Sequence, residues 1–299
     1  MHVYQRSIDG VNVFYDDEDF IVFFTIVSVL RKVYNVVVLE MCIMRNHLHL
    51  LVSADNLEDI SAFVRYYTSL FVLVSNHDIG RKGPLFHKSF GSAPKKGSKM
   101  IRSAIVYIGN NPVEKSMCTE AKLYRWNFLA YLESNTPFST YVKAKNRSHR
   151  LKLAIGEVDD MIKRNNYLSY PQVRRLLGSV SGNEREFLID YIISSYGLCD
   201  IGALLSYYDS LDDMFIAMKS TSGSEYEIKE VCYFGSDAVY DEMVRYVVED
   251  MEMVPARLVL TKSADEKINI ANALRKHTSA TMVQISKFLH IGSLGKKNV

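Results

Sequence analysis

Residues 44–52 read MRNHLHLLV, and an Arg-Asn turn in this run separates two apolar stretches. Such a pattern predicts a pair of strands, over residues 36–44 and 47–53. Side chains alternate between the faces of a strand, so His47 and His49 share one face while the intervening leucines pack on the other. Two imidazoles on one rigid surface form a platform for a divalent metal ion. The alternative is that they are ordinary polar strand residues, as most His-x-His pairs are.

Strand and helix patterns alternate on either side of this strand pair. Apolar periodicity and turn residues predict further strands over 3–6 and 85–90, and helices over 19–34, 57–76 and 98–111. The resulting β-α-β-β-α-β order, with one helix appended, predicts an α+β fold in which helices cover a small antiparallel sheet.

The expected helix over 98–111 carries Tyr107 and Asn111, which share one helix face because they are four residues apart. Such a face can present a phenol nucleophile and an amide oxygen to the same phosphate. Pro112 disfavours the helical conformation of the residue before it, so we expect the helix to end or kink near Asn111. The alternative is that Tyr107, one of 19 tyrosines, packs on the sheet without a chemical role.

Taken in order, these segments resemble the IS200-type single-tyrosine HUH transposases, and most closely their REP-associated branch. The resemblance covers about residues 1–140 and rests on an ordered set of short segments. In addition to residues 44–52, these are Val3-Tyr4-x-Arg6, Val13-Phe14-Tyr15-Asp16 with Asp19, Gly83-Pro84-Leu85-Phe86 and Tyr107-Ile108-x-x-Asn111-Pro112-Val113. It implies a ferredoxin- or RRM-like HUH domain. Departures from the family pattern are Arg45 in place of a proline, Phe86 in place of a tryptophan, and Lys115-Ser116 in place of alanine-glycine.

The resemblance also implies an activity and a site. It implies that His47 and His49 hold Mg²⁺ or Mn²⁺ with Asn111 as a third ligand, and that Tyr107 is the nucleophile. The activity would be cleavage and rejoining of single-stranded, hairpin-associated DNA through a 5′-phosphotyrosine, in transposition or repeat mobilisation. Two alternatives are a non-catalytic HUH-fold DNA-binding regulator and a replication-initiator or relaxase-like nuclease. The chain has no GxxxxGK[ST] segment that would indicate the helicase partner of the latter.

Charge is unevenly distributed along the chain, although its net value is only +2. Residues 81–150 carry 14 Lys/Arg against 3 Asp/Glu, and residues 256–299 carry 8 against 2, whereas residues 151–255 are strongly acidic. Basic blocks attract phosphates, although charge can also segregate by chance on solvated faces. In the first basic block the expected DNA contacts are Arg81, Lys82, Lys88, Lys95, Lys96, Lys99 and Arg102. Phe86 and Phe90 would either stack on unpaired bases or pack in the core.

Beyond a basic polar stretch at 143–150, which we expect to be a linker, the chain is predicted to be largely helical. Its end, 264–289, resembles a Trp-repressor or DnaA-like helix-turn-helix, with a turn at Thr278-Ser279. Such a unit would contact duplex DNA through residues such as Arg275, Lys276 and Gln284, although two ordinary packed helices would give the same pattern. The expected division is therefore an HUH domain over 1–142, an acidic helical domain over 151–255 and a helix-turn-helix segment over 256–299.

Composition excludes several other classes of protein. The longest apolar run, Phe20 to Leu30, is shorter than the roughly 20 residues that span a bilayer. The four cysteines lie far apart without CxxC spacing, which argues against a disulfide framework or a zinc site. No signal peptide is recognisable at the N-terminus. We expect a cytoplasmic protein without membrane contact that acts as a monomer or homodimer.

Overall fold

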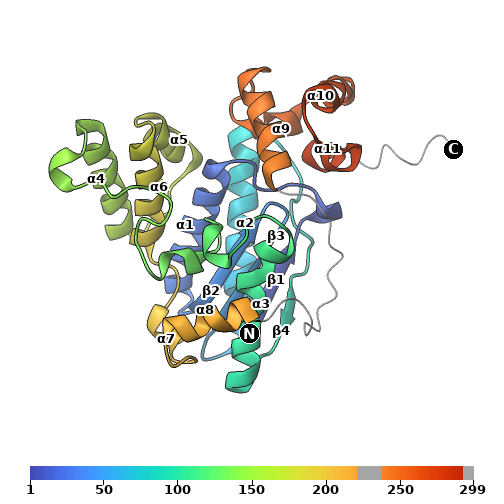
Figure 1. The fold of residues 1–299 in the computed structure, drawn as a ribbon. Helices are drawn as coiled ribbons and strands as arrows, with labels where there is room; N and C mark the ends of the chain where they lie inside the picture. The colour runs from blue at the N-terminus through green and yellow to red at the C-terminus, as the bar shows by residue number, and fades with distance from the viewer. Residues whose placement is uncertain (221–236, 292–299) are drawn as a thin grey trace.

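The computed structural model describes residues 1–220 and 237–291. Its centre is a four-stranded antiparallel sheet in the order β2-β3-β1-β4 (Figure 1). The strands are β1 (His2–Arg6), β2 (Val37–Met44), β3 (His47–Ser53) and β4 (Gly91–Ala93). This order and the β-α-β-β-α-β connectivity are those of a ferredoxin-like domain, which confirms the predicted α+β fold. Because β3 lies between β2 and β1, its middle residues are at the centre of the sheet.

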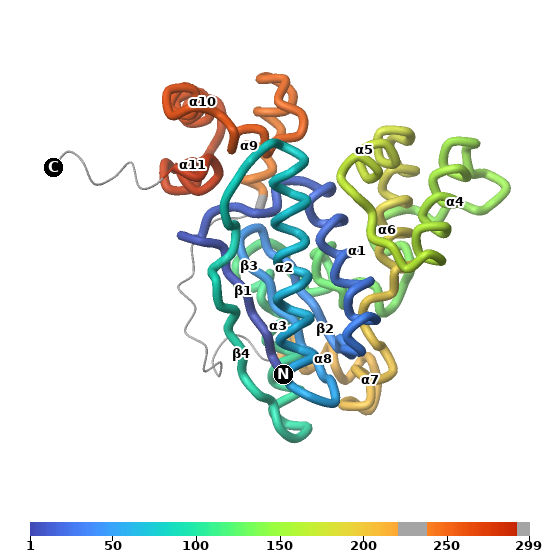
Figure 2. The backbone as a smooth tube through the Cα atoms, turned by 180° about the vertical axis from the view of Figure 1, so that it is seen from behind, coloured from blue at the N-terminus to red at the C-terminus, as the bar shows by residue number. Residues whose placement is uncertain are grey.

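Helices cover both faces of this sheet. Helices α1 (Asp17–Val33) and α2 (Leu57–Ile79) pack on one face, and α3 (Gly97–Glu114) packs on the other against β2 and β3 (Figure 2). The alternation along β1 agrees with this division, because the side chain of Gln5 donates to Thr68 of α2. His2, Tyr4 and Arg6 therefore point to the opposite face, the one that α3 covers.

Helix α1 is apolar on all sides, and the structure explains why. Its N-cap Asp16 accepts hydrogen bonds from the backbone amides of Glu18 and Asp19, and residues 19–30 are all buried. A helix with one covered face needs only an apolar stripe, whereas a helix covered on both sides is apolar all round. The second cover comes from α5 (Tyr170–Gly178) and α6 (Asn183–Tyr196), which pack on its outer side (Figure 2). Within residues 1–220 and 237–291 no helix is long and apolar enough to cross a membrane.

The rest of the described chain is helical, and its buried apolar residues fall into two groups. The first group joins the sheet with α4 (His149–Lys163), α5, α6, α7 (Ile201–Leu205) and α8 (Leu211–Ser220). The second is formed by α9 (Asp237–Glu249), α10 (Ala264–His277) and α11 (Met282–Phe288), together with Tyr15. Short 3-10 segments lie at Ile8–Gly10, Ala121–Leu123, Phe128–Tyr131, Ala144–Asn146 and Ala256–Thr261. The three-domain division stays a prediction.

Helices α9, α10 and α11 are docked at one end of the sheet (Figure 1). Arg45, in the β2–β3 turn, donates to the backbone oxygen of Tyr15 and forms an ion pair with Asp241 of α9. The hydroxyl of Tyr15 in turn donates to the backbone oxygen of Phe288 in α11. The arginine that replaces the family's proline thus links the strand turn to the C-terminal helices.

Two expectations for the first half are wrong in detail. The fourth strand is at Gly91–Ala93 and not at 85–90. Leu85 and Phe86 are buried in the core, and the pairing in that segment is limited to an isolated bridge between Phe86 and Ser7. The helix that carries Tyr107 does not end near Asn111 but continues to Glu114, with Pro112 inside it. Pro112 has no N–H to donate to the backbone oxygen of Ile108, but the turn continues beyond it, because the amides of Lys115 and Met117 bond the backbone oxygens of Asn111 and Pro112.

The predicted linker at 143–150 is also shorter than expected. A 3-10 turn covers Ala144–Asn146, and α4 begins at His149, capped by the Ser148 side chain that accepts from the amide of Leu151. The Ser148 hydroxyl and amide both donate to the carboxylate of Glu184 in α6, which fixes the start of α4 to its neighbour.

Candidate metal and nucleophile site

His47 and His49 occupy the face of β3 that α3 covers, as the strand alternation predicts. His49 is at the centre of the sheet and is fully buried, paired across the strands with Tyr4 and Cys42. His47 is half-buried beside the β2–β3 turn, and its Nδ1 lies 2.6 Å from Oδ1 of Asn46. The two imidazole rings are 5.2 Å apart and nearly perpendicular. The two rings therefore meet at one point in front of the sheet.

Helix α3 brings Asn111 and Tyr107 to that point. Oδ1 of Asn111 lies 3.3 Å from Nε2 of His47, and its Nδ2 lies 3.3 Å from Nε2 of His49. The Tyr107 ring meets the His49 ring edge-on at 5.5 Å. Asn111 is 1% exposed and Tyr107 5%, so the four side chains form one compact cluster under the helix.

Gly109 allows α3 to approach the sheet so closely. A Cβ atom at this position would lie 2.7 Å from Cδ1 of Leu129, 2.9 Å from Cε of Met218 and 3.2 Å from Oε1 of Glu40. The side-chain amide of Asn127 donates to the backbone oxygen of Gly109 and holds the helix at this height. A larger residue would force the ends of the neighbouring side chains to move, and Asn111 and Tyr107 lie on either side of this contact.

The donor set fits a divalent metal ion. Neighbouring ligands of an octahedral ion with bonds of about 2.1 Å lie roughly 3 Å apart, close to the 3.3 Å between Oδ1 of Asn111 and Nε2 of His47. Burial lowers the pKa of His49 well below its ordinary value of 6.5, and the neighbouring His47 and His2 lower it further. His49 is therefore a neutral imidazole at pH 7. Among the described residues no group of three or more His, Cys, Asp or Glu side chains could hold a metal ion.

Strand β1 contributes neighbours that the sequence analysis did not assign to the site. Nε2 of His2 lies 3.0 Å from Nδ1 of His49. The Tyr4 ring contacts the His49 ring at 6.4 Å, and the Arg6 guanidinium lies 5.7 Å from the centre of the Tyr4 ring. Positive charge on Arg6 and Lys115 also lowers the pKa of His49. The every-second-residue spacing of His2, Tyr4 and Arg6 matches that of His47 and His49, but only the strand register shows that these residues share a site.

Comparison with known families covers these same elements. The model of the family described as "Transposase IS200 like" matches residues 2–111, from His2 of β1 to Asn111 of α3. Residues 2–111 form an IS200-like transposase domain. No curated protein and no solved structure matches the chain. The matched span includes both histidines, Tyr107 and Asn111, and ends three residues before α3 does.

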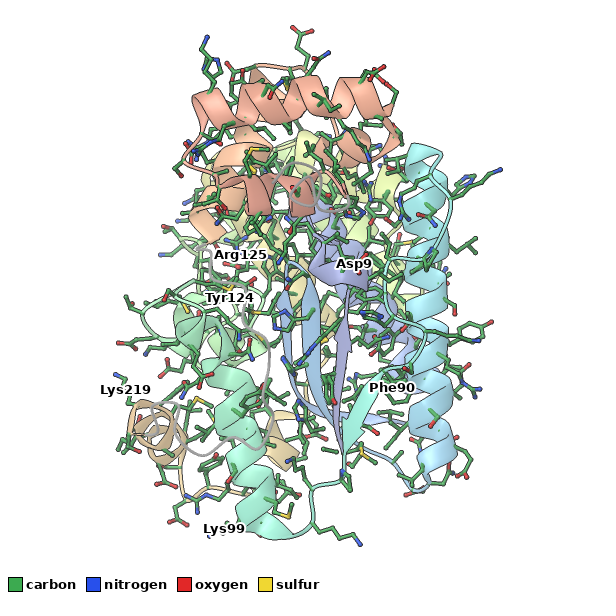
Figure 3. The ribbon with its side chains drawn as sticks, turned by 90° about the vertical axis from the view of Figure 1, so that its right-hand side faces the viewer. Asp9, Phe90, Lys99, Tyr124, Arg125 and Lys219 are labelled. Atoms are coloured by element: carbon green, nitrogen blue, oxygen red, sulfur yellow. The ribbon has the colours of Figure 1, made fainter. Side chains whose placement is uncertain are left out.

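The basic residues expected to contact DNA lie in two separate places on the transposase domain. Lys95, Lys96, Lys99 and Arg102 lie at or near the start of α3, at the end of the sheet away from α10 and α11 (Figure 3). Arg81 lies at the opposite end, where burial and then the charge of Arg81 lower the pKa of His290 and of Lys267. Its guanidinium donates to the backbone oxygens of Gly83 and Pro84 and to Asn76. Lys82 and Lys88 are exposed in the loop between α2 and β4.

The remaining predicted contacts differ in how accessible they are. Arg275 and Lys276 are exposed at the end of α10, although Arg275 also donates to the backbone oxygen of Ala280. Gln284 is mostly buried, and its Oε1 accepts from the amide and hydroxyl of Thr281 in the capping box of α11. Phe86 packs in the core against Phe14 and Phe71, whereas Phe90 is partly exposed. A role of Gln284 in reading bases stays a prediction.

Proposed function

We propose that this IS200-like transposase domain cleaves and rejoins single-stranded, hairpin-associated DNA, with Tyr107 as the nucleophile. The observation that carries the proposal is the convergence of two strand histidines with Asn111 and Tyr107 of α3. Asn111 lies 3.3 Å from both His47 and His49, and Tyr107 lies against His49. A tyrosine packed on the sheet only for stability would not need two imidazoles and an amide grouped beside it.

The chemistry assigns a role to each residue type. The phenol oxygen of Tyr107 attacks the scissile phosphorus and forms a P–O bond, while the bond from phosphorus to the 3′ oxygen breaks. The phenol loses its proton and the departing 3′ oxygen gains one, which leaves a 5′-phosphotyrosine and a free 3′-hydroxyl. Because the tyrosyl ester keeps the energy of the phosphodiester, a 3′-hydroxyl of another strand can reverse the step without ATP.

His47, His49 and Asn111 would hold Mg²⁺ or Mn²⁺ beside the scissile phosphate. Such an ion, when bound, polarises the phosphate and offsets its developing negative charge. The buried wall around His49 keeps that imidazole neutral, as a metal ligand must be. Asn111 supplies an oxygen, the ligand atom that Mg²⁺ and Mn²⁺ prefer.

Two surfaces are proposed for DNA. The exposed residues Lys96, Lys99 and Arg102 at the start of α3 would bind the phosphates of the single strand. Lys99 is two helical turns before Tyr107, about 12 Å along the helix. At the other end of the sheet, Arg275 and Lys276 of the α10–α11 pair would contact the duplex stem of the hairpin.

The test is covalent capture of DNA. Wild type and Tyr107→Phe are incubated with 5′-labelled and 3′-labelled single-stranded hairpins from the neighbouring genome, with Mg²⁺ or Mn²⁺, and separated by denaturing electrophoresis. Wild type is expected to form an adduct with the fragment 3′ of the cut, and Tyr107→Phe none. Tyr4→Phe is the matched comparison, since Tyr4 is the other tyrosine whose ring contacts His49.

The result identifies the nucleophile and distinguishes an enzyme from a non-catalytic regulator. An adduct lost in Tyr4→Phe but kept in Tyr107→Phe would move the nucleophile to β1. DNA binding by wild type without any adduct would favour the non-catalytic regulator.

A further inference from the structure

His2 is a second buried imidazole in direct contact with His49. It lies on β1, opposite Leu51 of β3, and its side chain is fully buried on the same face of the sheet as His49. Its Nε2 is 3.0 Å from Nδ1 of His49, which is the length of a hydrogen bond. At this distance one of the two nitrogens donates its proton and the other accepts.

The rest of the cluster decides which nitrogen donates. Nε2 of His49 faces Asn111 at 3.3 Å, and on that side His47 lies within reach of the same amide. The Nδ2 group of Asn111 can only donate, so Nε2 of His49 accepts from it and the proton of His49 has to be on Nδ1. Nδ1 of His49 then donates to Nε2 of His2, and His2 carries its own proton on Nδ1. One hydrogen bond thus defines the tautomers of both rings.

The same side chain also contacts the proposed nucleophile. The Tyr107 ring meets the His2 ring at 5.6 Å with an interplanar angle of 67°, and it meets the His49 ring at 5.5 Å and 86°. The phenol ring therefore packs in a T-shaped arrangement against both imidazoles. A replacement of His2 that opens space would loosen His49 and Tyr107 together.

We propose that His2 is a positioning residue of this site: it holds His49 as the Nδ1-protonated tautomer, with the lone pair of Nε2 directed toward Asn111, and it fixes the ring of Tyr107. The proposal rests on the proposed function, because the direction of this lone pair matters only if the site takes a metal ion. Histidine ligands of metal sites almost always donate their second nitrogen to such a partner, and loss of the partner usually weakens metal binding by about 10- to 100-fold.

The first test reads the tautomer directly in metal-free protein. Long-range ¹H–¹⁵N correlation spectra of ¹⁵N-histidine-labelled wild type are expected to show His49 protonated at Nδ1 and unprotonated at Nε2. His2→Leu is expected to weaken this preference, because only the Asn111 amide then favours it, and His290→Leu to keep it. His290 is the matched control because it is another largely buried histidine, bonded instead to the backbone oxygen of Asn12. A wild-type His49 protonated at Nε2, or a preference unchanged in His2→Leu, would overturn the proposal.

The second test measures Mn²⁺ affinity by electron paramagnetic resonance. His2→Leu is expected to weaken binding by about 10- to 100-fold, and His2→Gln to recover most of it, because the glutamine oxygen can accept from Nδ1 of His49. Rescue by glutamine distinguishes this hydrogen bond from packing alone. If His2→Leu does not fold, wild type and His2→Gln still decide the matter through the spectra.

The two proposals fail in different ways. If wild type binds no Mn²⁺, the metal in the proposed function is refuted, whereas the spectra still test the His2–His49 arrangement. If wild type binds Mn²⁺ and His2→Leu binds it equally well, the role of His2 is refuted and the proposed function stands.

Discussion

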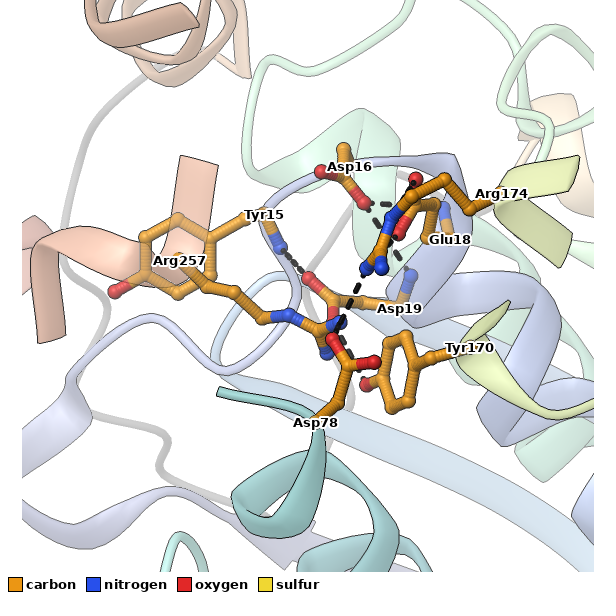
Figure 4. A network of polar contacts seen from close by, with 8 residues as sticks. All are labelled: Tyr15, Asp16, Glu18, Asp19, Asp78, Tyr170, Arg174 and Arg257. Carbon is orange, nitrogen blue, oxygen red and sulfur yellow. Dashed lines mark hydrogen bonds and ion pairs between the residues drawn. The ribbon is translucent and has the colours of Figure 1, made fainter. Parts of the chain in front are cut away.

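Arg257 donates from Nη1 to Oδ1 of Asp19 over 2.8 Å, and both side chains are buried (Figure 4). Its other terminal nitrogen donates to Asp78 at the end of α2 over 2.6 Å, and the guanidinium lies 3.4 Å from the centre of the Tyr170 ring. Arg257 belongs to the C-terminal segment, Asp19 to the start of α1 and Tyr170 to α5. This one side chain therefore joins the transposase domain to both helical groups.

Arg257→Met is expected to destabilise the protein strongly. Removing one partner of a buried ion pair leaves an uncompensated charge, here on Asp19, and typically costs about 3–5 kcal/mol. Urea unfolding measures the loss. Arg175→Met is the control, since the Arg175–Glu157 pair is exposed and such pairs contribute about 1 kcal/mol or less. Equal losses for the two variants would show that the buried network does not stabilise the fold.

Glu40→Gln is expected to stabilise the protein increasingly as pH rises. Within the described residues neither carboxylate oxygen of Glu40 has a hydrogen-bond partner, and burial raises its pKa well above 4.5. The native state keeps this proton after the unfolded chain has lost it. Wild-type stability therefore falls as pH rises above about 4.5, by up to about 1.4 kcal/mol per pH unit for this group.

Chemical denaturation of wild type and Glu40→Gln from pH 4 to pH 8 checks this. The difference between the two should be constant at the acid end and widen above it. A constant difference over the whole range would mean that Glu40 ionises as easily in the native state as in the unfolded chain.

Gly91→Ala is expected to disturb Tyr4. A Cβ on Gly91 would lie 1.9 Å from Cζ of Tyr4, so the ring must move, at a cost of about 1–3 kcal/mol. Thermal unfolding should show this loss in Gly91→Ala and little change in Ser92→Ala, whose site is exposed in the same strand. In a Tyr4→Ala background, Gly91→Ala should cost almost nothing more. A full additional loss of stability in the Tyr4→Ala background would show that the added methyl group clashes with a residue other than Tyr4.

Asn111→Ala and Asn110→Ala separate a metal ligand from its structural neighbour. Asn111 lies 3.3 Å from both histidines, whereas Asn110 donates to the backbone oxygen of Met218 in α8. Asn111→Ala is expected to weaken Mn²⁺ binding at least tenfold. Asn110→Ala should lower stability by about 1 kcal/mol, the usual contribution of one hydrogen bond, without changing Mn²⁺ affinity. Unchanged affinity in Asn111→Ala would remove it from the ligand set.

Lys96→Gln with Lys99→Gln tests the proposed path of the single strand. Each phosphate contact that is lost reduces the slope of log affinity against log salt by about 0.7 for single-stranded DNA. Fluorescence anisotropy over a salt series should therefore give a slope smaller by about 1.4 in the double variant. Lys163→Gln, an exposed lysine on α4, should leave the slope unchanged. A slope equal to that of wild type would place the strand on another surface.

Much of the site could be predicted from local patterns. Strand alternation places His47 and His49 on one face, and helical spacing places Tyr107 and Asn111 together, because both are properties of a short segment. The same holds for the element order and for the break before α11, where Thr281 and Gln284 form a capping box. The length of α3 could not be predicted in this way. A local rule treats Pro112 as the end of the helix, whereas the backbone hydrogen bonds after it continue the turn.

Other features depend on residues far apart in the chain. His2 meets His49 only because β1 pairs with β3 in a register that sets Tyr4 opposite His49, and a shift of one residue would turn His2 to the other face. Arg81 and Lys96 belong to the same basic block but lie at opposite ends of the sheet. Helix α2 ends just before Arg81, and the chain then passes along the sheet through β4 before α3 begins next to Lys96. Arg257 finds its two carboxylates only when α1, α2 and the C-terminal segment pack together. Side-chain spacing within an element is a local property, whereas register and packing arise from contacts across the whole fold.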